Sequence, residues 1–206
     1  MIKNTLEGIL AGIMIAIGGS VYVACSDKVV GAVFFSVALL TICMKGYSLF
    51  TGKVGFIPIS HKKDDISALL WGLLGNFIAT LVCGLLVALA LPTLHASAEV
   101  IAATKLTQTV WETLIRGFFC GVLMYAAVSI FRENKSSLGI FFCVPAFILA
   151  GFEHSIADMF YFALGHSFTL KTALFLLLVI LGNALGAMTM SALRLLGDKT
   201  VKTAKE

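Results

Sequence analysis

Six stretches of predominantly apolar residues follow one another along the chain, separated by short polar connections. They cover Leu6–Ala24, Val29–Phe50, Ile66–Leu91, Val110–Phe131, Ser137–Phe162 and Leu170–Leu196. About 20 residues of helix are needed to cross the hydrocarbon core of a bilayer, and each stretch reaches roughly that length. The pattern therefore predicts an all-α membrane protein with six transmembrane helices. These helices would form a single domain over residues 1–206, with no room for a soluble catalytic domain.

Two short motifs recur at nearly equal distances along the chain. Gly8-x-x-x-Gly12 in the first stretch is repeated as Gly117-x-x-x-Gly121 in the fourth, and Gly75-Asn76 in the third as Gly182-Asn183 in the sixth. Small residues at this spacing let two helices approach closely. The equal offsets predict two halves, about residues 1–92 and 105–206, with three helices each. Because three is an odd number, the halves would point in opposite directions as an inverted repeat.

The second and fifth stretches each run into a polar motif. After Tyr47 the chain meets Ser48–Gly55, which contains two glycines and a lysine, and Gly151–Phe160 contains Glu153, His154 and Asp158. Ionisable residues at such positions are costly in a membrane and mark a pathway or a site. The motifs predict that helices two and five are broken at matching depth. A simple loop at the first motif, and a helix cap at the membrane surface at the second, are the alternatives.

Basic residues are distributed unevenly between the connections, which predicts the orientation. With the N-terminus inside, the cytoplasmic segments carry Lys3, Lys62, Lys63, Arg132, Lys135, Arg194, Lys199, Lys202 and Lys205, and the outer connections carry Lys28, Lys105 and Lys171. Both termini are therefore expected in the cytoplasm, and the protein in the cell (inner) membrane as a multi-pass protein among lipid. No basic stripe with interleaved aromatic residues suggests nucleic acid. Lys45 and Arg116 receive no role from the pattern.

The potential metal ligands do not form a recognisable site. The five cysteines lie singly in or beside apolar stretches, and no second histidine or glutamate accompanies Glu153-His154 at a metal-ligand spacing. No metal or other cofactor is expected. A membrane-embedded enzyme would need such a site, and a non-conducting assembly subunit would not need two matched broken helices. A channel is favoured over both.

Two of these motifs resemble signatures of the formate/nitrite transporter family. Leu49–Lys53 (LFTGK) is similar to the family's loop in helix two, and Gly151–Met159 (GFEHSIADM) is similar to its break in helix five. The resemblance implies an aquaporin-like fold with one pore per protomer of a homopentamer. It also implies passage of small monovalent weak-acid anions, such as formate, nitrite or hydrosulfide, together with a proton.

The resemblance assigns roles to single residues. By similarity to the family, the apolar constrictions are Phe35, Leu39, Leu49 and Phe147; Thr51 and His154 lie between them; Lys105 lies at the outer mouth; Asn183 lies near the pore. Glu153 is expected to fix the geometry of its neighbour. Ser48 and Gly121 replace a glutamate and an asparagine that formate members often carry. The less polar lining favours an easily neutralised acid, such as hydrosulfide.

Overall fold

The computed structural model describes residues 1–60 and 63–203, and every regular element in this part of the chain is a helix. Five helices are long and apolar enough to cross a membrane by length and composition: α1 (Ile2–Ala24), α2 (Lys28–Lys45), α5 (Lys63–Ala90), α7 (Val110–Asn134) and α10 (Leu170–Thr203). The prediction of an all-α protein with several membrane-length helices is confirmed. Lys62 and Lys205, which contribute to the predicted orientation, lie outside the described residues.

The remaining helices are short. They are α3 (Phe50–Lys53), the 3-10 helix η1 (Val54–Phe56), α4 (Ile57–Ser60), α6 (Pro92–Lys105), α8 (Leu138–Leu149) and α9 (Ser155–Leu164). Helix α6 was not predicted from the sequence, and its residues were expected to form the connection between the two halves. Pro92 stands at the start of α6, where its fixed φ suits a helix and its missing N–H costs no hydrogen bond.

Two glycines with left-handed backbone stand where the chain leaves helical geometry. Gly46 (φ 73°) ends α2, and Gly151 (φ 72°) follows α8. Glycine adopts this conformation without the steric cost that a side chain would bring. The first irregular segment is therefore Gly46–Leu49. The predicted break at Ser48–Gly55 was placed too late, because the residues from Phe50 onward are helical again.

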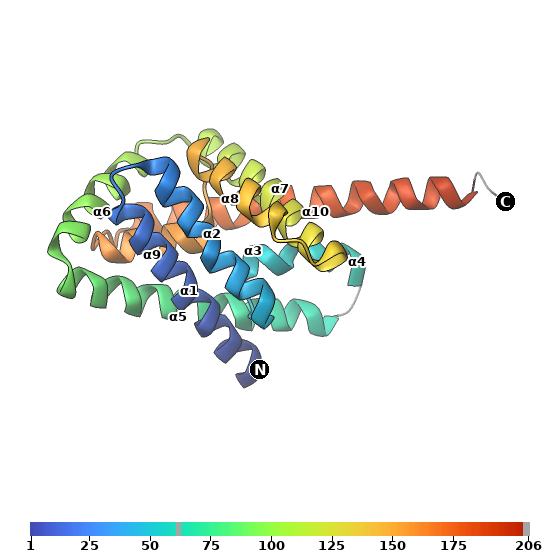
Figure 1. The fold of residues 1–206 in the computed structure, drawn as a ribbon, viewed down its shortest axis with the longest axis horizontal. Helices are drawn as coiled ribbons and strands as arrows, with labels where there is room; N and C mark the ends of the chain where they lie inside the picture. The colour runs from blue at the N-terminus through green and yellow to red at the C-terminus, as the bar shows by residue number, and fades with distance from the viewer. Residues whose placement is uncertain (61–62, 204–206) are drawn as a thin grey trace.

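Pairs of helices approach closely at glycines. A Cβ on Gly8 of α1 would collide with the backbone of Gly72 in α5, and a Cβ on Gly117 of α7 would lie 3.2 Å from the Cα of Gly182 in α10. The glycines of the repeated motifs therefore act as contact points between helices. Figure 1 shows α6 at one end of the bundle and the C-terminal part of α10 extending beyond the other end.

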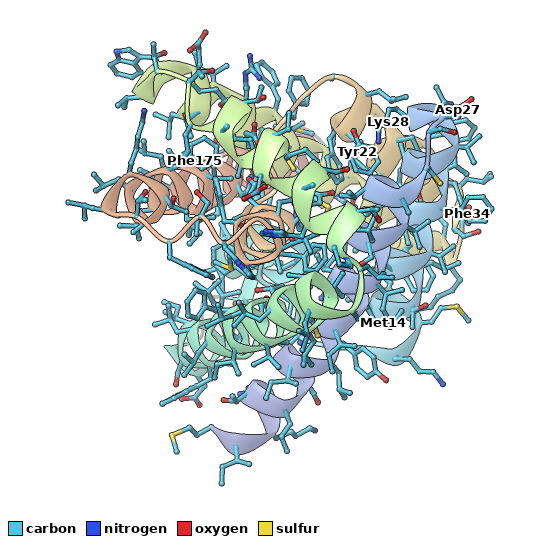
Figure 2. The ribbon with its side chains drawn as sticks, turned by 90° about the vertical axis from the view of Figure 1, so that its left-hand side faces the viewer. Met14, Tyr22, Asp27, Lys28, Phe34 and Phe175 are labelled. Carbon is cyan, nitrogen blue, oxygen red and sulfur yellow. The ribbon has the colours of Figure 1, made fainter. Side chains whose placement is uncertain are left out.

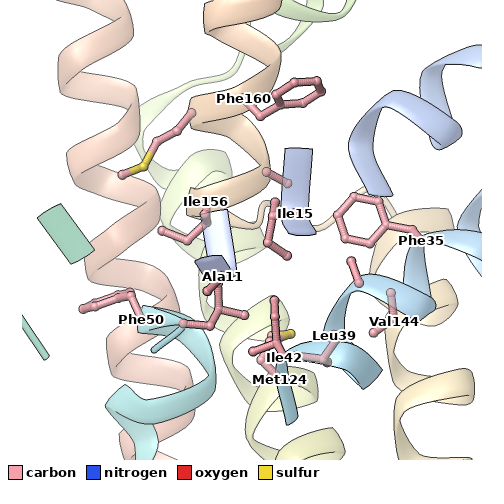
Figure 3. Packing of buried hydrophobic residues seen from close by; sticks show 14 of the residues in the cluster. Ala11, Ile15, Phe35, Leu39, Ile42, Phe50, Met124, Val144, Ile156 and Phe160 are labelled. Carbon is pink, nitrogen blue, oxygen red and sulfur yellow. The ribbon is translucent and has the colours of Figure 1, made fainter. Parts of the chain in front are cut away.

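The outside of the bundle is apolar and its centre is tightly packed. Phe34 points away from the bundle and is 56 % exposed, whereas its neighbour Phe35 is 2 % exposed (Figure 2). Phe35 and Leu39 belong to the central cluster drawn in Figure 3, which includes Ile15 and Ile156. An apolar exterior of this extent is the surface expected of a protein in contact with lipid.

Candidate transport site

A cavity of about 540 Å³ lies at the end of the bundle that holds α6; we call it the outer cavity, after the orientation predicted from the sequence. Its lining comprises Tyr22, Val23, Lys28, Phe35, Ser97, Val100, Ile101, Thr104, Lys105, Gln108, Arg116, Phe147, Ile148, Gly151, Phe152, Glu153, His154, Ala157, Asp158 and Tyr161. Figure 2 shows Lys28 and Tyr22 at this end of the molecule. The cavity contains the second polar motif and reaches Phe35 and Phe147 at its floor.

A smaller cavity of about 230 Å³ lies toward the other end of α2 and α7; we call it the inner cavity. Its lining comprises Leu39, Ile42, Cys43, Gly46, Tyr47, Leu49, Gly52, Lys53, Val128 and Arg132. Phe35 and Leu39 are one helical turn apart on α2 and are both 2 % exposed, yet they line different cavities. A thin layer of buried apolar side chains therefore separates the two cavities.

Two irregular segments, residues 46–49 between α2 and α3 and residues 150–154 between α8 and α9, are called the breaks below. A polar contact joins side chains at these two breaks. The Oγ1 of Thr51 lies 2.8 Å from the Nε2 of His154, and both side chains are buried. The Nδ1 of His154 accepts a hydrogen bond from the backbone N–H of Ala157 (3.1 Å). An Nδ1 that accepts carries no proton, so the neutral ring holds its proton on Nε2 and donates it to Thr51. The hydroxyl hydrogen of Thr51 then remains available, since among the described residues it has no other partner.

His154 also caps a helix, so the second alternative of the sequence analysis is correct in part. His154 is the N-cap of α9, but it is 3 % exposed and does not lie at a surface. Phe147 stacks on its ring at 5.6 Å between centroids and 14° between planes. The imidazole is therefore fixed by a helix cap, by a ring and by Thr51.

Lys105 lies in the outer cavity in an ion-paired cluster. Its ammonium contacts a carboxylate oxygen of Glu153 and lies 2.9 Å from Oδ1 of Asp158. Gln108 donates to the other oxygen of Glu153 at 2.6 Å. Burial alone would lower the pKa of Lys105, but the charges of Asp158 and Glu153 outweigh it and hold the pKa above its usual value. Two carboxylates thus share one ammonium.

Asp158 is a site residue that the sequence analysis noted but did not assign. It is 1 % exposed and stands one helical turn after His154 on α9. A buried carboxylate in an apolar segment was the signal that could have identified it. Its partner could not be read from the sequence, because Lys105 is 53 residues away on another helix.

Asn183 lies behind the break and holds its backbone. Its amide nitrogen donates to the carbonyls of Gly117 and Glu153, both at 2.8 Å, and its Oδ1 accepts from the N–H of Ser155 at 2.9 Å. The backbone atoms that leave the helix are thereby satisfied inside the protein, as they must be at membrane depth. Asn183 does not line either cavity.

Asn76 holds the backbone at the other break in the same way as Asn183 does. Its amide nitrogen donates to the carbonyls of Gly8 (2.8 Å) and Ser48 (2.9 Å), and its Oδ1 accepts from the N–H of Phe50 at 3.0 Å. Each of these residues has its counterpart in the second set of contacts 105 to 109 positions later. We refer to the two sets of hydrogen bonds as the asparagine clamps.

A bundle of apolar, membrane-length helices with a cavity at each end defines a membrane transport protein. The sequence profile described as "Formate/nitrite transporter" matches residues 1–196. The chain therefore belongs to the formate/nitrite transporter family, as the resemblance implied, and is a transporter or channel and not an enzyme.

Named relatives agree with this assignment. The chain is 32 % identical over 185 residues to the nitrite transporter NirC of Salmonella typhimurium, which covers 80 % of this chain and 68 % of the relative. Against NirC of Escherichia coli the identity is 30 %, covering 66 % of this chain and 55 % of the relative. The chain thus spans between half and about two thirds of the length of these relatives.

Solved structures share the fold. One described as an FNT family ion channel superposes with a TM-score of 0.79 at 25 % identity, covering 96 % of this chain and 88 % of that one. A pentameric formate channel with formate bound also gives a TM-score of 0.79, at 21 % identity and over 96 % and 97 % of the two chains. The second likeness concerns the fold alone.

Proposed function

We propose that the protein passes small monovalent anions of weak acids, of the formate, nitrite and hydrosulfide class, across the cell membrane. The observation that carries this proposal is the pair of cavities separated by a thin apolar layer, with the Thr51–His154 contact between the breaks. The names of similar proteins support it, since one is described as a nitrite transporter and another as a probable formate transporter.

The proposed architecture has six spans arranged as an inverted repeat of two halves. In this arrangement α8 and α9 together form the fifth span, and α2 with α3 to α4 forms the broken second span. The support for it is that the two asparagine clamps make equivalent contacts from equivalent residues. The apolar exterior and the pentameric relative support a homopentamer with one pore in each protomer.

The proposed pore narrows twice. Phe35 and Phe147 form the outer constriction, and Leu39 and Leu49 form the inner one; all four are at most 3 % exposed. Moving an ion into an apolar interior costs at least several kcal/mol even after relaxation. Protonating a carboxylic acid with a pKa of about 3.9 at pH 7 costs only about 4 kcal/mol. The neutral acid is thus the favoured species for the passage.

The Thr51–His154 pair provides the proton coupling in this proposal. Thr51 donates its hydroxyl hydrogen to the anion, and His154 supports Thr51 through Nε2–H. A hydronium ion that enters with the anion from the outer cavity gives its proton to Thr51 as the Thr51 proton moves to the anion, while Nε2–H stabilises the Thr51 oxygen and Nδ1 keeps its hydrogen bond from Ala157. The anion becomes the neutral acid, the hydronium ion becomes water, and the imidazole stays neutral. The Lys105–Glu153 contact keeps the residue before His154 in place.

Flux through the reconstituted protein tests the proposal directly. Liposomes with an entrapped pH dye receive an inward gradient of formate, nitrite or hydrosulfide in turn, and gluconate serves as a large anion that should be excluded. We expect at least one small acid to change the internal pH about tenfold faster than in empty liposomes. Equal rates in protein-containing and empty liposomes, with folded oligomer present, would contradict the proposal. Faster formate than hydrosulfide flux would contradict only the preference for hydrosulfide.

Reporter fusions test the orientation. A fusion after Lys135 or at the C-terminus should report from the cytoplasm, and fusions at Ala96 or His166 should report from outside. The reason is the excess of basic residues in the segments assigned to the cytoplasm. A C-terminal fusion that reports from outside would remove the arrangement of six spans.

A further inference from the structure

Charged side chains are not arranged alike in the two cavities. Lys28, Lys105 and Arg116 line the outer cavity together with two acids, Glu153 and Asp158. Both acids contact the ammonium of Lys105. An ammonium between two carboxylates presents little positive charge to an approaching anion, because the opposite charges cancel beyond a few ångströms. Lys105 is therefore a poor source of long-range attraction.

Arg116 lines the same cavity without such a partner. Among the described residues, no carboxylate forms an ion pair with it. Its Nη1 lies 3.8 Å from the place that a Cβ on Gly151 would occupy, so the guanidinium reaches the break. Its charged neighbour is Glu112, one turn earlier on α7. Glu112 accepts from the N–H and the hydroxyl of Thr109 at 2.7 and 2.9 Å and does not line the cavity, so Arg116 is the member of this pair that faces an entering anion.

Lys28 is the other basic residue of this cavity outside the cluster. Its ammonium donates to the carbonyls of Cys25 (3.0 Å) and Tyr22 (3.3 Å) and lies 5.0 Å from the centre of the Tyr22 ring. It follows Asp27 in the chain, and Figure 2 shows both residues at this end of the molecule. Arg116 reaches Gly151 in the break that holds His154, whereas Lys28 is bound to carbonyls at the end of α1. Of the two, Arg116 is therefore the charge nearer to that break.

The inner cavity has a corresponding arginine on the same helix. Arg132 lies 16 residues after Arg116 on α7, which corresponds to about 24 Å of helix. Its guanidinium lies over the ring of Phe56 at 3.9 Å. Lys53 is the second basic residue of this lining and has Glu7 at 3.9 Å. Within the described part of the chain, no acidic residue lines the inner cavity.

We propose that Arg116 and Arg132 are the residues that concentrate the substrate anion, one at each mouth of the pore. The inference rests on the proposed function and deepens it, since it names the specificity-determining charges of that pore. An uncompensated charge in a low-dielectric mouth raises the local concentration of the opposite ion, and the effect falls with ionic strength. Because α7 carries one such charge at each end, attraction operates on the anion from both sides of the membrane.

The test is formate or nitrite uptake into right-side-out membrane vesicles, using whichever anion the parent protein passes. Uptake is measured at ionic strengths of roughly 0.01 M and 1 M, where the Debye length is about 30 Å and about 3 Å. Arg116→Gln should lower the initial uptake about three- to tenfold at low ionic strength and less than twofold at high ionic strength. Arg116→Lys should retain most of the low-salt uptake. Arg194→Gln, which removes an exposed arginine outside both cavities, should behave as the parent.

The inner charge is tested in the same vesicles by efflux. Arg132→Gln should lower low-salt efflux by a similar factor, and this measurement decides the question if Arg116→Gln is not recovered as folded oligomer. Parental low-salt rates in the tested arginine variant would overturn the inference. A parent protein that passes neither anion would instead contradict the proposed function.

Discussion

Replacing Asn183 with leucine is expected to prevent recovery of folded protein. The change leaves the carbonyl of Glu153 and the N–H of Ser155 without partners in the interior, and it removes the second hydrogen bond to the carbonyl of Gly117, which lies within α7. Each buried group without a hydrogen bond costs about 1–3 kcal/mol. Two together cost several kcal/mol, which is comparable to the total free energy of unfolding of about 5–15 kcal/mol for many proteins. The measurement is the yield and melting temperature of detergent-extracted oligomer.

A matched control separates this loss from the effect of any change on α10. Leu185, two residues later on the same helix, is 45 % exposed, and Leu185→Ala should leave the yield nearly unchanged. Asn76→Leu should behave as Asn183→Leu does, because Asn76 makes the equivalent contacts. A leucine variant of Asn183 that melts within about 2 °C of the parent would show that the clamp contributes little.

His154→Asn is expected to retain the fold and lose the coupling between proton and anion. Asparagine is a good N-cap, so it can still accept from the N–H of Ala157 and keep α9 in place. Its shorter side chain does not carry a donor to the position of Nε2, so Thr51 loses the hydrogen bond that supports its proton transfer. Removing a route worth about 4 kcal/mol lowers the flux of the neutral acid by up to about a thousandfold. Liposome flux as a function of pH, with the membrane potential clamped, measures both the rate and the charge carried.

Thr51→Val provides the companion variant, because it keeps the shape of the side chain and removes only the hydroxyl. It should reduce the neutral flux about ten- to hundredfold, the effect of one lost hydrogen bond to a polar or charged partner. If His154→Asn kept the pH dependence and the electroneutrality of the parent, His154 would not take part in the proton transfer. The proton would then enter with the acid from the outer cavity.

The repeated motifs drew attention to the two asparagines, but they did not predict the hydrogen bonds that these residues form. Gly75-Asn76 and Gly182-Asn183 recur in the sequence with an equal offset. Their role depends on carbonyls that lie 66 to 68 residues away along the chain and belong to other helices. Such contacts have no local signature. A buried amide within an apolar helix therefore predicts that a polar partner exists, and only the structure identifies it.

Positions that depend on the conformation of one residue were predicted less well. Gly46 is one of 19 glycines, and its left-handed backbone was not evident from its neighbours, so the break in helix two was placed too late. The ion pairs of Lys105 were also not foreseen, because spacing located the lysine without its acids. Phe35 and Leu39 were assigned to constrictions by similarity, and they line the outer and inner cavity, respectively.

All residues of one asparagine clamp lie before position 92 and all residues of the other lie after position 105, whereas the Thr51–His154 contact joins the two sets. Each clamp therefore holds the irregular segment in its own part of the chain, and the proposed chemistry lies where the two parts meet. Leu49 and His154 occupy equivalent positions in the two breaks, 105 residues apart. Two equivalent positions of the chain thus carry an apolar side chain in one break and an imidazole in the other. An ancestral duplicated half could acquire this asymmetry by changing a single side chain, without altering the backbone that carries it.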